Sequence, residues 1–195
     1  MPRVTPPLCP HCGKPQGTAD LCSNCVDHLQ SIEGLRSTCL YEGTLREAIH
    51  RFKYGNMRAL AVPLGDLLVD VWRSVSRGVE VLVPVPLHRR RLRERGYNQS
   101  RLLALRLSTS VGVPVVDDAL RRIRYTASQT RLGMHERHEN VVNAFSCVSD
   151  RLQGKRVALV DDVCTTGATL EACGAALRAG GVASVWAVTV ARAVQ

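Results

Sequence analysis

The sequence is poor in aromatic residues and has no long apolar run. Aromatic side chains make up 4% of the 195 residues, which is too few for a protein that binds single strands mainly by stacking bases on rings. No run reaches the roughly 20 apolar residues that a membrane-spanning helix needs, and residues 1–7 lack the apolar core of a signal peptide. We therefore expect a soluble, cytoplasmic protein without membrane insertion. The length suits one α/β domain with a small additional unit.

Acidic residues are also in the minority. The chain has 17 acidic and 26 basic residues, which gives a formal net charge of +9. A positive charge of this size favours polyanionic partners, such as a phosphorylated small molecule or nucleic acid, but it carries no information about the fold.

Cysteine, in contrast, is concentrated near the N-terminus. Four of the eight cysteines form two Cys-x-x-Cys pairs, at Cys9, Cys12, Cys22 and Cys25. In an intracellular chain this spacing is typical of a structural zinc site with four thiolate ligands. A redox dithiol or a disulfide pair is the alternative. His11 and His28 are further candidate ligands, although four cysteines already complete a tetrahedral site. Because so short a segment has little core, the metal would supply most of its folding energy.

The other four cysteines are scattered along the chain. Cys39 and Cys147 stand alone, and Cys173 has the helical spacing of a small core residue. Cys164 precedes an expected helix, whose N-terminus can lower the pKa of a thiol and make it reactive. An apolar spacer at this position is the alternative interpretation.

Strands and helices alternate along most of the chain. A cysteine-rich unit (1–35) precedes two expected helices at Thr44–Tyr54 and Arg58–Ser76, the second interrupted near Pro63. Residues 79–195 then form the core, which begins with a strand at Val79–Pro86. The core continues with a helix at 98–110, short strands at 113–116, 120–123 and 141–145, and a last apolar strand at 182–191. This order predicts an α/β fold with a mainly parallel sheet and helices on both faces.

The segment Arg156–Thr169 combines a strand, two acids and the start of a helix. Val157–Val160 is typical of a buried strand, and Asp161 and Asp162 follow it directly. The helix, which runs to about residue 179, is opened by Thr165, Thr166, Gly167, Ala168 and Thr169. A helix N-terminus binds phosphate, and carboxylates accept hydrogen bonds from sugar hydroxyls, directly or beside Mg²⁺. The segment therefore predicts a sugar-phosphate site, with a Rossmann-like strand and helix carrying chance acids as the alternative.

A second polar segment follows the strand that ends at Pro86. Six arginines and one glutamate lie between Arg89 and Arg101. Open α/β sheets bind ligands at the carboxyl ends of their strands, and arginine side chains match phosphate oxygens. This segment is therefore a candidate pyrophosphate site, and a solvated basic face is the alternative. Further along, residues 126–139 lack an apolar stripe and predict a mobile loop or a loosely packed helix.

The strand-to-helix segment resembles the PRPP-binding motif of type I phosphoribosyltransferases. In that motif, four apolar residues, two acids and two variable residues precede Thr-Gly-x-Thr, where PRPP is 5-phosphoribosyl 1-pyrophosphate. The resemblance implies that Asp161, Asp162 and residues 165–169 bind PRPP together with Mg²⁺. It also implies a pyrophosphate loop after the first core strand, at Pro86, Leu87, His88 and Arg89.

The whole chain is similar to the ComF family, in which an N-terminal zinc ribbon precedes an amidophosphoribosyltransferase-like domain. The similarity includes residues 48–55, 84–91, 95–100, 129–132, 136–137 and 140–141 in addition to the segments above. The family is linked to natural competence, which implies single-stranded DNA and competence-machinery proteins as partners. Residues 36–78 would form a hood that recognises the acceptor. Gln129, Arg131 and Arg137 would belong to a flexible loop that closes over the site.

Two classes of function stay open on this evidence. One is a phosphoribosyltransferase with an unidentified acceptor that takes part in DNA uptake. No side chain is recognisable as its general base, and Thr165 stands where several base-salvage relatives have an acid. The other is a non-catalytic module that senses PRPP or binds single-stranded DNA.

Overall fold

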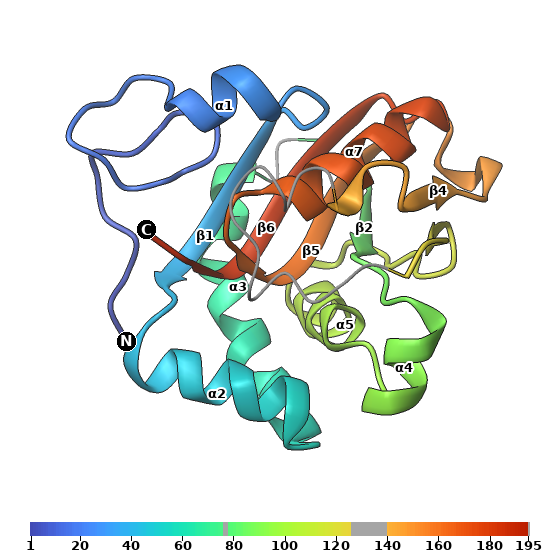
Figure 1. Ribbon diagram of the computed structural model, residues 1–195, viewed down its shortest axis with the longest axis horizontal. Helices are drawn as coiled ribbons and strands as arrows, with labels where there is room; N and C mark the ends of the chain where they lie inside the picture. The colour runs from blue at the N-terminus through green and yellow to red at the C-terminus, as the bar shows by residue number, and fades with distance from the viewer. Residues whose placement is uncertain (76–77, 126–139, 195) are drawn as a thin grey trace.

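The computed structural model describes residues 1–75, 78–125 and 140–194 (Figure 1). In chain order its elements are α1 (Ser23–His28), β1 (Gly34–Leu40), α2 (Gly43–Tyr54), the 3₁₀-helix η1 (Arg58–Leu60), α3 (Ala61–Val75), β2 (Val81–Pro84), α4 (Arg89–Arg95), α5 (Gln99–Val111), β3 (Leu120–Arg122), β4 (Phe145–Cys147), the 3₁₀-helix η3 (Asp150–Leu152), β5 (Arg156–Cys164), α7 (Ala168–Ala179) and β6 (Ser184–Arg192). Within these ranges, no helix is long and apolar enough to cross a membrane.

The central sheet contains four parallel strands in the order β1-β6-β5-β2. Helices α3 and α5 pack on one face, and α7 packs on the other (Figure 1). The separate strands β3 and β4 form an antiparallel pair that lies against α7. The predicted mainly parallel sheet with helices on both faces is therefore confirmed.

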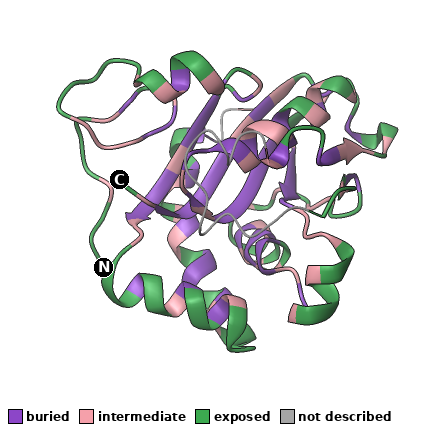
Figure 2. Cartoon of the chain, in the orientation of Figure 1, coloured by how far each residue is buried: buried purple, intermediate pink, exposed green. Residues whose placement is uncertain are grey.

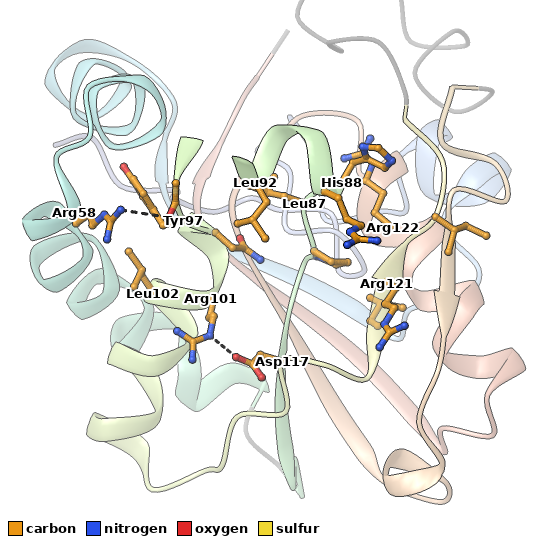
Figure 3. Close-up of a pocket in the computed structure, with 16 residues that line it drawn as sticks. Arg58, Leu87, His88, Leu92, Tyr97, Arg101, Leu102, Asp117, Arg121 and Arg122 are labelled. Carbon is orange, nitrogen blue, oxygen red and sulfur yellow. Dashed lines mark hydrogen bonds and ion pairs between the residues drawn. The ribbon is translucent and has the colours of Figure 1, made fainter. Parts of the chain in front are cut away.

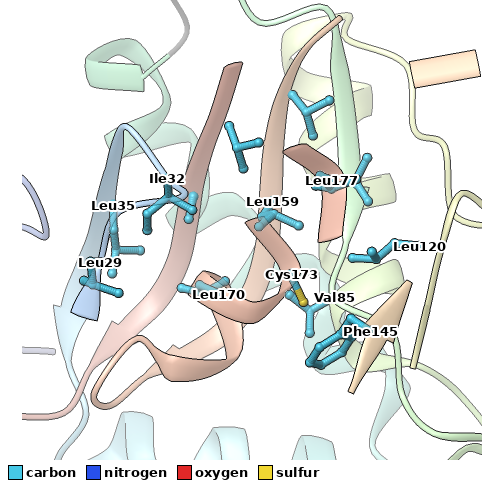
Figure 4. Close-up of a cluster of buried hydrophobic side chains, with 14 of the residues drawn as sticks. Leu29, Ile32, Leu35, Val85, Leu120, Phe145, Leu159, Leu170, Cys173 and Leu177 are labelled. Carbon is cyan, nitrogen blue, oxygen red and sulfur yellow. The ribbon is translucent and has the colours of Figure 1, made fainter. Parts of the chain in front are cut away.

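Strand β5 explains why the apolar run at Val157–Val160 shows no polar alternation. Val157 and Leu159 belong to the core under α7, whereas Ala158 and Val160 belong to the core under α3 and α5. All four residues are buried, as Figure 2 shows for the centre of the sheet. A strand that is covered on both faces needs apolar side chains at every position. Figure 4 shows the α7 side of this arrangement, where Leu159 lies close to Leu170 and Cys173.

Several predicted elements have different bounds in the structure. The residues predicted as a strand at 113–116 form only a single bridge, between Leu82 and Val115. The strand predicted at 141–145 is wrong, because β4 starts at Phe145, where pairing with β3 begins. Pro63 falls in the first turn of α3, where a missing N–H removes no helical hydrogen bond, so the interruption lies before it, at η1.

The cysteine-rich unit packs against the sheet rather than standing apart from it. Leu29, Ile32 and Leu35 are buried in the same apolar cluster as α7 (Figure 4). The chain then enters β1, which pairs with β6 from Gly34 onward. The boundary predicted between residues 35 and 36 falls within this strand, so the division into two domains stays a prediction.

Candidate functional site

The carboxyl end of β5 leads into a short loop, and α7 begins directly after it. We call Thr165–Thr169 the phosphate loop. Gly167 has a φ of 88°, in the left-handed region that favours glycine, and a Cβ atom there would lie 3.0 Å from Leu29 Cδ2. The Thr166 hydroxyl accepts a hydrogen bond from the Ala168 amide at 3.3 Å. Because Gly167 provides no capping side chain, the N-terminus of α7 offers an anion site of the kind that phosphates occupy.

The two acidic residues lie inside β5 rather than after it. Asp161 pairs in register with Thr189 of β6, and both carboxylates are buried. Asp161 Oδ1 accepts hydrogen bonds from the Ser100 hydroxyl at 2.7 Å and from the Asp162 amide at 2.9 Å. Burial and the neighbouring charge of Asp162 nevertheless raise the pKa of Asp161 to about 6. Asp161 therefore changes protonation at a higher pH than an ordinary aspartate does.

Asp162 faces a cation that sequence analysis did not connect with this site. Lys53, near the end of α2, places its Nζ atom 2.9 Å from Asp162 Oδ1. Burial works to lower the pKa of Lys53, but the charges of Asp162 and Asp161 outweigh it and leave that pKa above its ordinary value. Asp162 Oδ2 is buried and has no hydrogen-bond partner among the described residues. One oxygen of this carboxylate is thus paired, and the other can accept a hydrogen bond from a ligand.

The predicted pyrophosphate loop lies beside this strand end. Its preceding residue, Val85, donates its amide to Val160 O at 3.0 Å, which joins the loop to β5. His88 accepts a hydrogen bond from the Arg90 amide at 3.3 Å and so begins α4, and Gly96, with a φ of 78°, ends it. Most of the basic segment is therefore a short helix on the surface, with Pro86 and Leu87 forming the link between β2 and α4.

A basic groove runs between α2 and α4. We call it the arginine–tyrosine groove; it has a volume of about 610 Å³ and is lined by Lys53, Tyr54, Asn56, Arg58, Arg91, Arg93, Glu94, Arg95, Gly96 and Tyr125. The guanidinium of Arg95 stacks on the Tyr54 ring at 5.2 Å, and those of Arg90 and Arg91 approach Tyr125 at 5.0 and 5.9 Å. Five cations and two partly exposed tyrosines thus meet next to the buried acids.

A second cavity, of about 890 Å³, lies on the other side of α4 (Figure 3). Its wall includes the pyrophosphate loop, the start of α5 and strand β3. Arg101 forms an ion pair with Asp117 there, and Arg121 and Arg122 lie opposite. Neither the two acids of β5 nor the phosphate loop lines this cavity, which is connected with the strand-end site through the pyrophosphate loop.

The four N-terminal cysteines come together as one cluster. Their Sγ atoms all lie within 4.8 Å of one another, and three of the pairs, Cys9–Cys25, Cys12–Cys22 and Cys22–Cys25, are separated by 3.6, 3.7 and 3.4 Å. A tetrahedral zinc ion with Zn–S bonds of about 2.3 Å requires Sγ–Sγ distances of about 3.8 Å. The donor set and its spacing therefore fit zinc, as the sequence predicts.

Within the cluster, the surroundings lower the pKa of Cys12 and favour its thiolate, whereas burial raises the pKa of Cys22. A hydrogen bond from Cys25 lowers the pKa of Cys12 to about 4, assisted by the charge of Arg192 and opposed by burial. The same hydrogen bond raises the pKa of Cys25. His11 Nε2 is buried without a hydrogen-bond partner among the described residues, and the cluster does not include it. The structure thus groups the four cysteines without either histidine.

Other residues singled out in the sequence lie apart from these groups. Cys39 and Cys173 are buried core residues. Burial raises the pKa of Cys164 to about 11, so this thiol is not the reactive alternative. The predicted flexible-loop residues Gln129, Arg131 and Arg137 lie outside the described residues.

Comparison with known proteins gives a consistent result. Residues 96–195 match the family model for a phosphoribosyl transferase domain. The chain is 35% identical to Competence protein F of Haemophilus influenzae, over 96% of this chain and 85% of that protein. It is 33% identical to the DNA utilization protein YhgH of Escherichia coli K12, over 94% of this chain and 83% of that protein.

A likeness to a solved structure accompanies these matches. Glutamine phosphoribosylpyrophosphate amidotransferase from B. subtilis aligns over 67% of this chain with a TM-score of 0.47 and 21% identity. The present chain spans about a quarter of that enzyme, 26% of its length.

Proposed function

The chain belongs to the ComF family of phosphoribosyltransferase-like proteins, and on that premise we propose that it binds PRPP with Mg²⁺ at the carboxyl end of β5 and serves DNA uptake in the cytoplasm. The names of its relatives, a competence protein and a DNA utilization protein, support the cellular role. Protein partners from the competence machinery belong to the same proposal.

One observation carries the PRPP assignment. Asp162 Oδ2 is a buried acceptor without a partner among the described residues, and it lies three residues before a helix-opening loop of threonine and glycine. An unpaired buried acceptor is costly unless a ligand satisfies it. Ribose hydroxyls would donate to Asp161 and Asp162, and the phosphate loop would bind the 5-phosphate at the N-terminus of α7.

The same acids fit Mg²⁺. Carboxylate oxygens are the protein ligands that this ion prefers, and it is commonly held by one or two carboxylates together with substrate phosphates. Bound Mg²⁺ would offset the charge that develops on the departing pyrophosphate. The chain's own contribution is to orient the ribose through the two acids and to bind pyrophosphate through the loop of His88 and Arg89, where the guanidinium offsets its charge.

Transfer and sensing differ in what happens to PRPP. In transfer, an acceptor nucleophile displaces pyrophosphate from the anomeric carbon; in sensing, PRPP dissociates intact. Asp161 and Asp162 carry out the binding in both cases. Because the sequence offers no recognisable general base, we propose PRPP binding as the step that both alternatives share.

Isothermal titration calorimetry with Mg²⁺ and PRPP tests the binding step. The double variant Asp161→Asn/Asp162→Asn should lose PRPP affinity by about 100-fold or more, whereas Asp66→Asn, which alters an exposed carboxylate on α3, should not. Unchanged affinity in the double variant would refute the site. A pyrophosphate-release assay with candidate nucleobases, amines and DNA ends then separates the two outcomes: acceptor-dependent release identifies a transferase, and PRPP binding without release identifies a sensor.

The arginine–tyrosine groove supports a second function for the same protein, single-stranded DNA binding. Its cations suit a phosphate backbone, and Tyr54 and Tyr125 offer ring faces on which bases can stack. With 4% aromatic residues in the chain, such contacts would be few, so phosphate contacts should dominate and sequence preference should be weak.

Fluorescence anisotropy with a labelled oligonucleotide at several salt concentrations tests this function. Arg91→Gln/Arg95→Gln should weaken binding and reduce the salt slope by about 1.4, which is about 0.7 for each lost phosphate contact to a single strand. Tyr54→Ala should weaken single-strand binding without a change in that slope. Arg46→Gln/Arg73→Gln, which removes the same charge from exposed positions on α2 and α3, is the matched control. Equal losses in both arginine pairs would show a diffuse charge effect and remove the groove from the proposal.

A further inference from the structure

The last residue of β6 connects the cysteine cluster with the strand-end site. Arg192 is 2% exposed and heads the fully buried side chains in residue volume. Its Nη1 atom lies 2.9 Å from Cys164 Sγ, and its Nη2 atom lies 3.5 Å from Cys12 Sγ. Nη1 is also 3.5 Å from the Cys12 carbonyl oxygen. One guanidinium thus contacts a zinc-cluster cysteine and the residue immediately before the phosphate loop.

The partners of Arg192 are unusual for a buried arginine. In the part of the chain that the structure describes, no carboxylate forms an ion pair with it, and its Nε atom has no hydrogen-bond partner. A buried cation without a compensating charge is strongly destabilising. Four thiolates around one divalent zinc ion carry a net charge of −2, so the occupied cluster would provide that compensation. Among the described residues, the occupied cysteine cluster would therefore supply negative charge to a cation that no carboxylate pairs with.

The contact on the other side reaches the phosphate loop. Cys164 ends β5 and is followed directly by Thr165, and its position depends on register pairing with Arg192. Two further contacts join the cysteine-rich unit to this loop: Asn24 Nδ2 donates to Thr166 O at 2.9 Å, and Leu29 packs against Gly167. The cysteine-rich unit thus contacts the phosphate loop directly through Asn24 and Leu29, and its cysteine cluster is linked to the residue before the loop through Arg192.

We propose that Arg192 is a positioning residue that couples metal occupancy of the cysteine cluster to the geometry of the phosphate loop, and so to the affinity for PRPP. The effect on PRPP affinity rests on the function proposed above, whereas the coupling between the metal and the phosphate loop does not. Coupling of this kind is reciprocal, so PRPP must strengthen zinc binding by the same factor by which zinc strengthens PRPP binding.

Hydrogen exchange of the full chain tests the coupling without any ligand. Amides of residues 163–170 should exchange at least 10-fold faster after zinc is removed with a zinc-selective chelator. Arg192→Met should show the faster exchange even with zinc bound. Because loss of Arg192 can affect folding, Cys164→Ala provides a milder break of the same contact and should give the same direction of change. Loop exchange that is unaffected by zinc removal, or is of wild-type rate in both variants, would overturn the proposal.

A matched control separates this contact from general docking of the cysteine-rich unit. Arg36 donates to the carbonyl oxygens of Pro10 and His11, at 2.8 and 2.9 Å, and among the described residues no hydrogen bond joins it to the phosphate loop. Arg36→Gln should therefore leave loop exchange close to the wild-type rate while zinc is bound. An equal acceleration in Arg36→Gln and Arg192→Met would show that docking alone governs the loop, which would also overturn the specific role of Arg192.

Calorimetry extends the test to the ligand. Zinc removal should weaken PRPP binding about 10-fold in the wild type, in buffer with excess Mg²⁺, and much less in Arg192→Met, whose affinity should already be low. Zinc affinity measured by chelator competition should rise about 10-fold with PRPP in the wild type only. A wild-type protein that does not bind PRPP at all would contradict the proposed function, while the exchange experiment would still decide the coupling.

Discussion

Lys53 Nζ lies 2.9 Å from Asp162 Oδ1, which joins the helix after β1 to the acid pair of β5. The carboxylate side chain is 3% exposed and the lysine 21%, so the pair is largely removed from water. The end of α2 therefore contributes a side chain to the candidate ribose site, in addition to belonging to the hood expected at residues 36–78. Tyr97 strengthens this arrangement, because its hydroxyl donates to the Phe52 carbonyl oxygen one residue earlier in α2.

Removing the charge of Lys53 should destabilise the fold. Lys53→Met leaves Asp162 buried without its cation, which should lower the free energy of unfolding by about 2–4 kcal/mol in urea denaturation. Adding Asp162→Asn should restore most of the loss, because the uncompensated charge disappears. Lys155→Met, which breaks an exposed pair with Glu80, should cost less than about 1 kcal/mol. Equal losses for the two lysines would contradict the role of burial.

Neutralising Asp161 should have the opposite effect on stability. Its pKa is raised from 3.8 to about 6 in the folded state, so the folded protein binds a proton that the unfolded chain has released. Stability should therefore fall as the pH rises from about 4 to about 6. Asp161→Asn removes this loss and should be more stable than the wild type by on the order of 3 kcal/mol at pH 7.5. The difference should vanish near pH 4.

Thermal unfolding at several pH values, without Mg²⁺ or PRPP, checks this expectation. Asn keeps an oxygen that can accept from the Ser100 hydroxyl, so the hydrogen bond at 2.7 Å need not be lost. A variant less stable than the wild type at pH 7.5 would show that the ionised carboxylate stabilises the fold. The same variant should bind PRPP more weakly, which would make Asp161 a residue kept for function at a cost in stability.

Gly167→Ala tests the close approach of the cysteine-rich unit to the phosphate loop. The substitution adds backbone strain, since φ is 88°, and a Cβ atom at 3.0 Å from Leu29 Cδ2. Gly112→Ala is a matched control, because φ there is 73° and no atom lies within 4 Å of the added Cβ. We expect backbone strain to lower the free energy of unfolding by about 1 kcal/mol in both variants. The contact with Leu29 should lower it by about a further 1–2 kcal/mol in Gly167→Ala alone. Urea denaturation of both proteins measures the difference.

Metal analysis of the purified chain checks the zinc site. We expect about one zinc per chain in the wild type and a large loss in Cys25→Ser, whose thiolate is one of four ligands. Cys147→Ser changes a half-buried cysteine outside the cluster and should retain the metal. A fully folded N-terminus without metal, or equal metal content in both variants, would contradict the assignment.

The cysteine cluster and the strand-to-helix motif could be predicted because their residues are close in the sequence. Helix α4 could have been predicted as well: His88 caps its start, Gly96 ends it in the left-handed conformation, and Arg90 pairs with Glu94 one turn on. Its arginine-rich sequence has no apolar stripe, which is why periodicity did not reveal it. Asp161 was expected after its strand, but pairing with β6 extends β5 to Cys164.

Lys53, Ser100 and Arg192 belong to the site through tertiary structure alone. Each comes from a different element, and nothing in its local sequence points to Asp161, Asp162 or Cys164. The sequence by itself determined the ligand chemistry, namely four thiolates, two adjacent acids and a helix start, because these depend on neighbouring residues. Only the tertiary structure decided which distant cations, Lys53 and Arg192, lie beside the negative charges of the acids and the thiolates. The reason is that helices must cover both faces of the sheet, and this packing determines which helix ends meet which strand ends.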